Sequence, residues 1–490
     1  MFKTRFAPSP TGFLHVGGLR TALYAYLVAR KNQGKFLLRI EDTDQERTVV
    51  GGVENILKSL AWAGIVVDEG VVEKDGKIIQ VGDNGPYIQS ERLEIYKKYV
   101  DELVVKDFAY PCFCSAERLT ELRDYQQKNK LPTGYDGCCQ KLSKEEIAKK
   151  ISTGEKYVIR MKMSEIGETK FVDEIRGEVV FKNELIDDQI ILKSDGFPTY
   201  HLAVVVDDHL MEINYVIRGE EWLSSTPKHL QLYKYLGWEP PKFAHLPLIL
   251  NPDKSKLSKR QGDVAVEDYR AKGYLPEALI NFVAFLGWNP GDERELFTLD
   301  ELIEDFTVEK VGRAGAVFNL EKLNWYNKEY LKKKDNKELV ILTKQFFMIA
   351  GVDLENKDDT WLVKAIALEK ERATTLLELA ENLRFVFTLP DYEGKILVWK
   401  KSDTTSAKKI LNELKEFLEQ IPESDWMKDK MAEKIGEWIK EKNLTNGEVL
   451  WPLRVALSGQ ENSPGPFEIA EVLGKEESLR RVEKGIKKLN

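Results

Sequence analysis

Cysteine is scarce in this chain, and long hydrophobic runs are absent. Only four cysteines occur among 490 residues, and all lie between positions 112 and 139. So few cysteines exclude a secreted scaffold held together by disulfide bonds. No run approaches the ~18 uninterrupted apolar residues of a membrane-spanning helix. The opening residues MFKTRFAPSP also lack the apolar core of a signal peptide. We therefore expect a cytosolic (cytoplasmic) protein that does not associate with membranes.

Two common nucleotide-binding signatures are missing as well. Neither a G-x-x-x-x-G-K-[ST] loop nor a G-x-G-x-x-G fingerprint occurs in the expected context. Their absence argues against P-loop kinases and nicotinamide dehydrogenases. The formal net charge of -8 excludes non-specific coating of nucleic acid but leaves room for a local basic groove. Hydrophobic residues at 42% exclude a disordered chain, and the length predicts several folded domains.

The N-terminal segment predicts a strand, a helix and a second strand. Residues 3–7 form a short extended run, which Pro8 and Pro10 interrupt. Apolar residues recur at helical spacing over 17–31, and KFLLRI at 35–40 predicts the next strand. Such a β-α-β unit is the seed of a doubly wound parallel sheet. Further strands are predicted over 190–193, 202–206, 216–222 and 243–250.

The remaining segments differ in character from this sheet. All the cysteines and many Lys and Glu residues lie in 91–194, which we interpret as an insertion that splits the sheet domain. Beyond about residue 330 the pattern has helical periodicity with mixed charges. The predicted fold class is α/β plus all-α. The expected parts are a split parallel-sheet domain at 1–90 and 195–248, an insertion at 91–194, a connecting domain at 249–330 and a helical domain at 331–490.

Two motifs carry candidate chemistry. In the first, His15 and the glycines Gly17 and Gly18 open the predicted helix directly after a strand. A helix N-terminus attracts phosphate through its amides and dipole, and glycine lets a ligand approach the backbone. His15 can donate to a phosphate oxygen or a ribose. The alternative is a surface histidine before an ordinary helix.

The second motif is the basic segment KSKLSKRQG at 254–262, which follows a predicted strand and turn. A cationic loop of this kind can close over a triphosphate and stabilise the charge that develops on its leaving group. The alternative is a solvated basic loop with no ligand.

Together the two motifs resemble those of a known family. HVGG resembles the HIGH element of class I aminoacyl-tRNA synthetases, and KLSKR resembles their KMSKS element. The segments RFAPSPTGFLHVGGLRTAL, RIEDTD, VIRGEEWLSSTP and KLSKRQGD are similar to bacterial-type glutamyl-tRNA synthetases. The resemblance continues through GYLPEALINFVAFLGW to LGKEESLRR and so covers essentially the whole chain. It implies a split catalytic domain with an inserted acceptor-stem domain and a C-terminal anticodon-binding domain.

The resemblance also implies a reaction and a set of site residues. The enzyme would activate L-glutamate with ATP and Mg²⁺ to glutamyl-adenylate, and then pass glutamate to the 3′-terminal adenosine of tRNA(Glu). Residues implied around glutamate are Arg5, Ala7, Ser9, Glu41, Tyr200 and Arg218. Residues implied around ATP are His15, Gly17, Gly18, Glu221, Lys256, Leu257 and Lys259, of which His15, Lys256 and Lys259 are the implied catalytic residues.

Residue chemistry fits these assignments, although simpler interpretations exist. Guanidinium forks such as Arg5 and Arg218 suit carboxylates, and Glu41 suits an ammonium group. Tyr200 could instead be part of the core, and Glu41 could cap a turn with Thr43. No protein nucleophile is needed, because positioning and charge stabilisation carry this kind of rate enhancement.

The cysteine cluster suits a structural zinc ion. Cys112, Cys114 and Cys139 resemble the zinc spacing of some family members, and thiolates suit tetrahedral zinc. The fourth ligand could be Tyr135 or Cys138, although adjacent cysteines strain joint coordination. The alternative is a set of reduced thiols without metal.

Other readings of the chain stay open at this point. They are a non-discriminating enzyme that also charges tRNA(Gln), a glutaminyl-tRNA synthetase, a shorter relative that modifies a tRNA base, a small-molecule nucleotidyltransferase and a catalytically inactive tRNA-binding protein. Candidate tRNA contacts are the basic residues of 322–337 and of the C-terminal helices, including Arg454, Arg480 and Arg481. The family expectation for the oligomeric state is a monomer.

Overall fold

The computed structural model describes residues 1–163, 166–257, 265–355, 357–400 and 402–489. The predicted catalytic residue Lys259 lies outside these described residues. The chain divides into two compact units, one of residues 1–269 and 279–320 and one of residues 270–278 and 321–490. Within the described part of the chain, no helix is long and apolar enough to cross a membrane.

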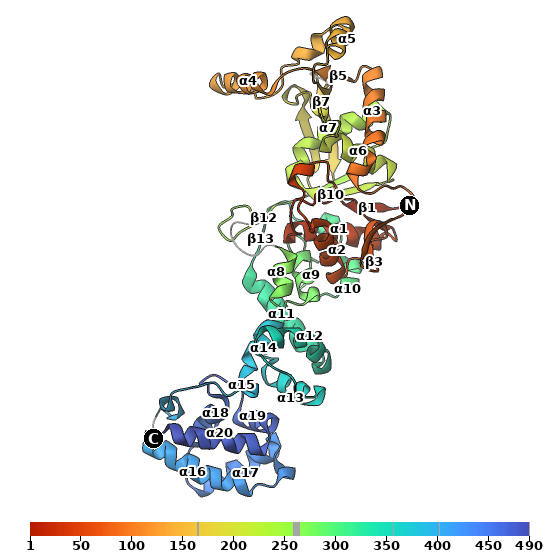
Figure 1. Ribbon diagram of the computed structural model, residues 1–490. Coiled ribbons are helices and arrows are strands. Elements are labelled where there is room, and N and C mark those ends of the chain that lie inside the picture. Colours follow the sequence, from red (N-terminus) through yellow and green to blue (C-terminus); the bar gives the residue numbers. More distant parts are fainter. Residues whose placement is uncertain (164–165, 258–264, 356, 401, 490) are drawn as a thin grey trace. The chain divides into compact units, whose positions relative to one another are not determined.

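The first unit is built on a mixed eight-stranded sheet (Figure 1). Its strand order is β4-β3-β2-β1-β10-β11-β7-β8. The pairs from β3 to β7 are parallel, and β4 and β8 are antiparallel strands at the two edges. The strands of this sheet are β1 (Lys3–Phe6), β2 (Lys35–Leu38), β3 (Glu69–Lys74), β4 (Lys77–Val81), β7 (Glu168–Asp173), β8 (Gly177–Lys182), β10 (Tyr215–Gly219) and β11 (Lys242–Leu246).

Helices cover both sides of the parallel strands, as a doubly wound sheet requires. Figure 1 shows α1 and α2 on one side of β1 and β10, and α6 and α7 on the other. Helix α1 packs against β1, β10 and α10, and its side chains are buried on nearly every face. The helices up to α10 are α1 (Val16–Lys31), α2 (Gly52–Trp62), α3 (Leu93–Val105), α4 (Ala116–Lys128), α5 (Lys144–Ser152), α6 (Tyr200–Leu210), α7 (Thr226–Leu236), α8 (Val266–Ala271), α9 (Pro276–Ala284) and α10 (Leu299–Asp305).

One predicted strand is wrong. Residues 202–206 (LAVVV) belong to helix α6, where all of them are buried. A short apolar run without alternation fits a buried strand and a buried helix equally well, so periodicity could not separate them. The predicted strand 243–250 is two strands, β11 and β12 (Ile249–Leu250), and β12 pairs with β13 (Ala316–Val317).

The predicted insertion at 91–194 is not wholly separate from the sheet. It contains its own three-stranded sheet of β5 (Ala109–Cys112), β6 (Val158–Met161) and β9 (Ile190–Leu192). However, the hairpin β7–β8 joins the large sheet through a parallel pairing of Asp173 with Phe243 of β11. The insertion therefore contributes two strands to the domain that it interrupts.

The second unit is helical, as the periodicity of the C-terminal part predicts. Its core includes Arg481, which is fully buried and donates to the carbonyl oxygens of Phe385, Val386 and Leu457. The helices from α11 onward are α11 (Leu320–Lys333), α12 (Asn336–Ile349), α13 (Asp359–Glu369), α14 (Leu376–Asn382), α15 (Arg384–Phe387), α16 (Thr404–Gln420), α17 (Lys428–Glu441), α18 (Asn446–Ser458), α19 (Pro466–Leu473) and α20 (Lys475–Lys488).

Candidate active site

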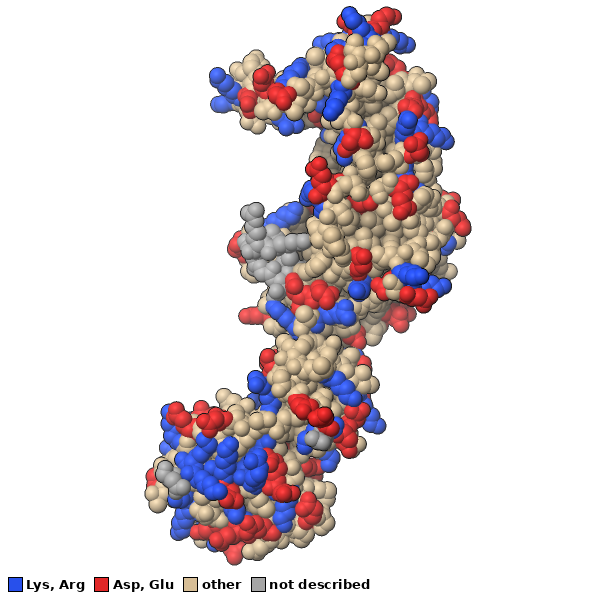
Figure 2. All heavy atoms as spheres, in the orientation of Figure 1, with Lys and Arg blue, Asp and Glu red and all other residues tan. Residues whose placement is uncertain are grey.

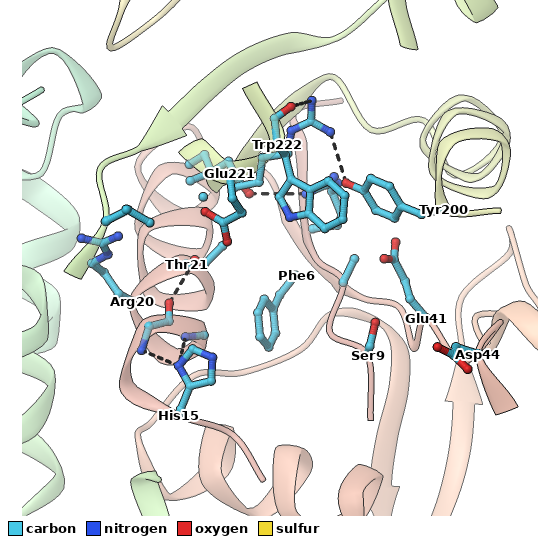
Figure 3. A pocket seen from close by; sticks show the side chains of 18 of the residues that line it. Phe6, Ser9, His15, Arg20, Thr21, Glu41, Asp44, Tyr200, Glu221 and Trp222 are labelled. Atoms are coloured by element: carbon cyan, nitrogen blue, oxygen red, sulfur yellow. Dashed lines mark hydrogen bonds between the residues drawn. The ribbon is translucent and has the colours of Figure 1, made fainter. Parts of the chain in front are cut away.

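A cavity of about 830 Å³ opens at the carboxyl ends of β1, β2 and β10 (Figure 3). Ligands bind in this place in open α/β sheets. Every predicted glutamate- or ATP-site residue that the structure describes lines this cavity. They are Arg5, Ala7, Ser9, His15, Gly17, Gly18, Glu41, Tyr200, Arg218, Glu221, Lys256 and Leu257. The structure therefore brings residues from distant parts of the sequence to one place, while their individual roles stay predictions.

His15 is the N-cap of helix α1. Its Nδ1 accepts hydrogen bonds from the backbone amides of Gly17 and Gly18, at 3.0 and 3.3 Å. A side chain at Gly17 would place its Cβ 2.8 Å from Cε1 of His15, so glycine is required for this cap. With Nδ1 as the acceptor, a neutral His15 carries its proton on Nε2. The backbone amides of Gly17 and Gly18 are therefore already hydrogen-bonded within the turn.

The two flanks of the basic segment lie near the same helix start. Lys256 and Leu257 line the cavity, and Ala265 forms a β-bridge with His15. The backbone amide of Val266 also donates to the carbonyl of Leu14. The residues that follow the basic segment are thus held beside the HVGG motif, and those at its start line the same cavity as that motif.

Two buried guanidinium groups share one carboxylate in the floor of the site. Arg5 donates to Asp208 through Nε at 3.1 Å and Nη2 at 3.3 Å. Arg39 donates to the same Asp208 at 2.8 Å and to Glu41 at 3.1 Å. The Arg5 and Arg39 guanidiniums hold the pKa of Asp208 below its usual range although burial acts in the opposite direction. Burial raises the pKa of Glu41, and the same two arginines oppose that shift.

Arg218 is surrounded differently. It is 5% exposed, and it donates to His245, His229, Tyr200 and Thr226 at 3.0, 3.1, 3.2 and 2.9 Å. Among the described residues, no carboxylate forms an ion pair with it. The positive charge of this buried guanidinium therefore has no negative partner among these residues, which favours the binding of an anion beside it. The sequence predicted both Arg5 and Arg218 as site residues. Only the structure shows that Arg5 is paired with a carboxylate and that Arg218, within the described part of the chain, is not.

Several site residues were not predicted from the sequence. Trp222 lines the cavity with its ring 4.0 Å from that of Tyr200, and Figure 3 shows this pair on the side of the cavity away from His15. Lys193 and Asp44 line it as well. Asp208 was not predicted either, because the apolar run before it, residues 202–206, predicts a strand instead of the helix α6 that positions it. Two adjacent acids in an apolar segment are the signal that could have revealed it.

Three cysteines and a tyrosine meet in the insertion. The sulfur atoms of Cys112, Cys114 and Cys139 all lie within 4.8 Å of one another, and those of Cys114 and Cys139 are 3.5 Å apart. The Tyr135 hydroxyl lies 3.4 Å from the Cys112 sulfur and 3.6 Å from that of Cys114. Cys138 is exposed and not part of this group. Thiolates around tetrahedral zinc lie about 3.8 Å apart, given Zn–S bonds of ~2.3 Å, so the donor set fits zinc.

Basic side chains gather over helix α20 in the second unit (Figure 2). Arg480, Lys484 and Lys487 are exposed there. Arg481, which we expected among the tRNA contacts, is buried and unavailable. The Arg454 guanidinium lies 4.7 Å from the centre of the Trp451 ring. Such a pair suits a stacked RNA base, so it stays a candidate contact.

Comparisons with known proteins place this site in a family. The description "tRNA synthetases class I (E and Q), catalytic domain" matches residues 1–325, and the description "Anticodon binding domain" matches residues 338–486. The chain therefore belongs to the class I tRNA synthetases of the E and Q family.

Its relatives include glutamate–tRNA ligases of similar length. Those of Alkaliphilus metalliredigens (strain QYMF) and Chloroherpeton thalassium (strain ATCC 35110 / GB-78) are each 47% identical to this chain. The matches cover 98% and 100% of this chain and 98% of each relative. The crystal structure of a glutamate tRNA ligase from Elizabethkingia meningosepticum CCUG26117 in complex with its amino acid matches with a TM-score of 0.89. That match has 38% identity and covers 100% of both chains.

Proposed function

We infer that this chain is a glutamate–tRNA ligase that uses ATP and Mg²⁺. An oxygen of the glutamate α-carboxylate attacks the α-phosphorus of ATP, and pyrophosphate leaves. A ribose hydroxyl of the tRNA terminal adenosine then attacks the carbonyl carbon of the glutamyl-adenylate, and AMP leaves. The protein contributes by holding these groups in line and by stabilising developing charge. Family membership and full-length similarity to glutamate–tRNA ligases support this inference.

The observation that supports the substrate assignment is the buried positive charge of Arg218, which no carboxylate of the described residues neutralises. We assign the side-chain carboxylate of glutamate to this guanidinium, with the Tyr200 hydroxyl beside it. The floor formed by Arg5, Asp208 and Arg39 supports the ligand from below, and Glu41 is the partner for its ammonium group. Ala7 and Ser9 border the same space.

The opposite side of the cavity suits ATP. His15 offers its Nε2 proton to a phosphate, and the close backbone at Gly17 and Gly18 leaves room for that approach. Glu221 is placed for a ribose or base contact, and Lys256 brings a cation to the phosphates. We assign Leu257 to the nucleotide pocket and Lys259 to the phosphates, the latter from the KLSKR motif alone. Magnesium arrives with ATP.

A zinc ion in the insertion completes the proposal. Cys112, Cys114 and Cys139 would hold it with Tyr135 as the fourth ligand. Zinc there would tie β5 to the later loop and stabilise the insertion, which we assign to the tRNA acceptor stem. The activation chemistry does not call for it.

The remaining assignments concern tRNA and cellular setting. We assign residues 1–90 and 195–248 to catalysis, 249–330 to the KMSKS-type loop and tRNA stem contacts, and 331–490 to the anticodon of tRNA(Glu). We assign the protein to the cytoplasm, a reducing compartment, because its four cysteines form no disulfide bond with one another. We propose a monomeric enzyme, in keeping with the family expectation.

The test is glutamate charging of two purified transcripts, tRNA(Glu) and tRNA(Gln), with ATP and magnesium. Charging of tRNA(Glu) alone would establish a discriminating enzyme. Charging of both would establish a non-discriminating one. Failure with both transcripts and with native bulk tRNA would reject the proposed function.

A further inference from the structure

Arg218 is joined to a histidine and a carboxylate on the two neighbouring strands. Its Nε lies 3.0 Å from Nε2 of His245, and Nδ1 of His245 lies 2.6 Å from Oδ2 of Asp173. Arg218, His245 and Asp173 belong to β10, β11 and β7, which are adjacent in the sheet. The exposed fractions of the three residues are 5%, 0% and 1%. This chain of contacts is therefore shielded from bulk solvent.

The direction of every hydrogen bond in this chain is fixed. The Arg218 Nε–H group can only donate, so Nε2 of His245 must be the acceptor. The His245 proton then lies on Nδ1 and is donated to Asp173. Asp173 is held in turn by the backbone amides of His245, Ile175 and Arg176. Burial lowers the pKa of His245, which keeps its ring neutral in this arrangement.

A second histidine serves Arg218 in the same way. Nδ1 of His229 lies 3.1 Å from Nη1 of Arg218, and Nε2 of His229 lies 3.1 Å from Nδ1 of His201. Of the five histidines in the chain, His229 and His245 contact the Arg218 guanidinium, and His201 contacts His229. Neutral imidazoles satisfy its N–H groups without contributing a negative charge in direct contact. The neighbouring Arg5 instead contacts the carboxylate of Asp208.

We propose that His245, oriented by Asp173, is a positioning residue that holds Arg218 in place with its charge uncompensated, and thereby sets selectivity for a carboxylate over a carboxamide side chain. The inference rests on the proposed placement of glutamate at Arg218. A carboxylate at the His245 position would hold the guanidinium equally well. It would also neutralise it before the ligand arrives, so glutamate would lose its advantage over glutamine.

Three substitutions of similar size separate the functions of the imidazole. His245→Gln can place an amide oxygen where Nε2 lies and so keeps a neutral acceptor for Arg218. His245→Glu places a carboxylate oxygen at the same point. His245→Asn can still donate to Asp173 but is too short to reach Arg218. The readout is kcat/KM for glutamate and for glutamine in charging of tRNA(Glu), with KM for ATP as the internal control.

We expect the glutamate-to-glutamine ratio of kcat/KM to fall at least about tenfold further in His245→Glu than in His245→Gln. We also expect glutamate use to be weaker in His245→Asn than in His245→Gln, with KM for ATP within about twofold throughout. Equal ratios in the Gln and Glu variants, or equal glutamate use in the Gln and Asn variants, would overturn the proposal. The Gln–Asn comparison decides the matter if the Glu variant does not fold.

Arg218→Lys separates this inference from the assignment on which it rests. Arg218→Lys could raise KM for glutamate while the three His245 variants have equal kcat/KM values for glutamate and equal glutamate-to-glutamine ratios. In that case the role of His245 is wrong and the glutamate assignment stands. If Arg218→Lys leaves KM for glutamate unchanged, the glutamate assignment fails, and the role of His245 fails with it.

Discussion

The Nε atom of Arg5 lies 3.1 Å from the Oδ1 atom of Asp208, deep in the floor of the cavity. Both side chains are 4% exposed, and Arg39 shares the same carboxylate. Arg5 therefore enters the site already paired. In the proposed function, Arg5 supports the floor and adds a partial positive field, and Arg218 provides the charge that distinguishes glutamate from glutamine.

Asp208→Asn should destabilise the catalytic unit strongly. Removing one partner of a buried ion pair leaves an uncompensated charge and typically costs about 3–5 kcal/mol. Denaturant unfolding of the full-length enzyme measures this cost. Glu102→Gln is the control, because its pair with Lys106 is on the surface, where such pairs contribute ~0–1 kcal/mol. Equal losses for the two variants would contradict the account of the floor.

His15→Asn should separate folding from catalysis. Asparagine is a good N-cap, and its side-chain oxygen can replace Nδ1 as the acceptor for the amides of Gly17 and Gly18. The variant lacks Nε2, however, so we expect ATP-dependent activation of glutamate to slow by about 10²-fold, as for loss of one preorganised donor. Pyrophosphate exchange with tRNA(Glu) present measures the rate. Circular dichroism melting checks that the fold is kept.

His15→Ala completes the comparison. It loses the cap as well as the donor, so it should also cost roughly 1 kcal/mol of stability. If His15→Asn retains nearly full activity, the imidazole serves only as a cap and its phosphate role is wrong.

The purified enzyme should contain close to one equivalent of zinc. Cys139→Ser should lose the metal, because Cys139 belongs to the cluster of three thiols. Cys138→Ser is the matched control, since its exposed neighbouring thiol lies outside that cluster and zinc content should not change. Elemental analysis after gel filtration provides the measurement. Well under half an equivalent in the unmodified enzyme would argue for reduced thiols without metal.

Acid should destabilise the enzyme through its buried histidines. Burial and the nearby cation of Lys228 lower the pKa of His201 to about 4, and burial also lowers those of His229 and His245. Between about pH 6.5 and pH 4 the unfolded chain binds protons that the folded one does not, so stability falls as pH falls. Each such histidine contributes a slope of up to about 1.4 kcal/mol per pH unit.

His201→Asn isolates one of these contributions. The Asn side-chain oxygen can replace Nδ1 of His201 as the acceptor for His229, but the variant no longer titrates there. Its free energy of unfolding should match the original at pH 8 and fall less steeply between pH 6.5 and pH 4. An unchanged slope would contradict neutral burial of His201.

Much of this architecture could be predicted from the sequence because local pattern and position agree. The structure confirms the strand at 3–7, the helix at 17–31 and the helical C-terminal unit. Each of them is marked in the sequence by hydrophobic periodicity or by the Pro and Gly residues that end it, and tertiary contacts do not override these local signals. Helix α6 was missed because its apolar residues face a buried environment on all sides. Because α6 was not predicted, Asp208 was not predicted as the partner of Arg5. The sequence therefore did not show that, among the described residues, Arg5 is paired with a carboxylate and Arg218 is not.

Tertiary pairing explains the other misses. The contact between β7 and β11 joins residues 173 and 243, and nothing local marks β7 as part of the large sheet. The link from Asp173 through His245 to Arg218 depends on that pairing, so no motif could reveal it. Arg481 illustrates the opposite error, because a basic helix predicts exposure while three backbone carbonyls hold this side chain inside.

The most direct measurement is the kinetics of Arg218→Gln with glutamate and glutamine as competing amino acids. The variant keeps polar contacts to Tyr200 and Thr226 within reach but removes the uncompensated positive charge. We predict that kcat/KM for glutamate falls by about 10²-fold or more, the usual cost of losing a buried charge-assisted contact. The preference over glutamine should fall with it, while KM for ATP stays within about twofold. An unchanged preference for glutamate would contradict the claim that Arg218 recognises the substrate carboxylate.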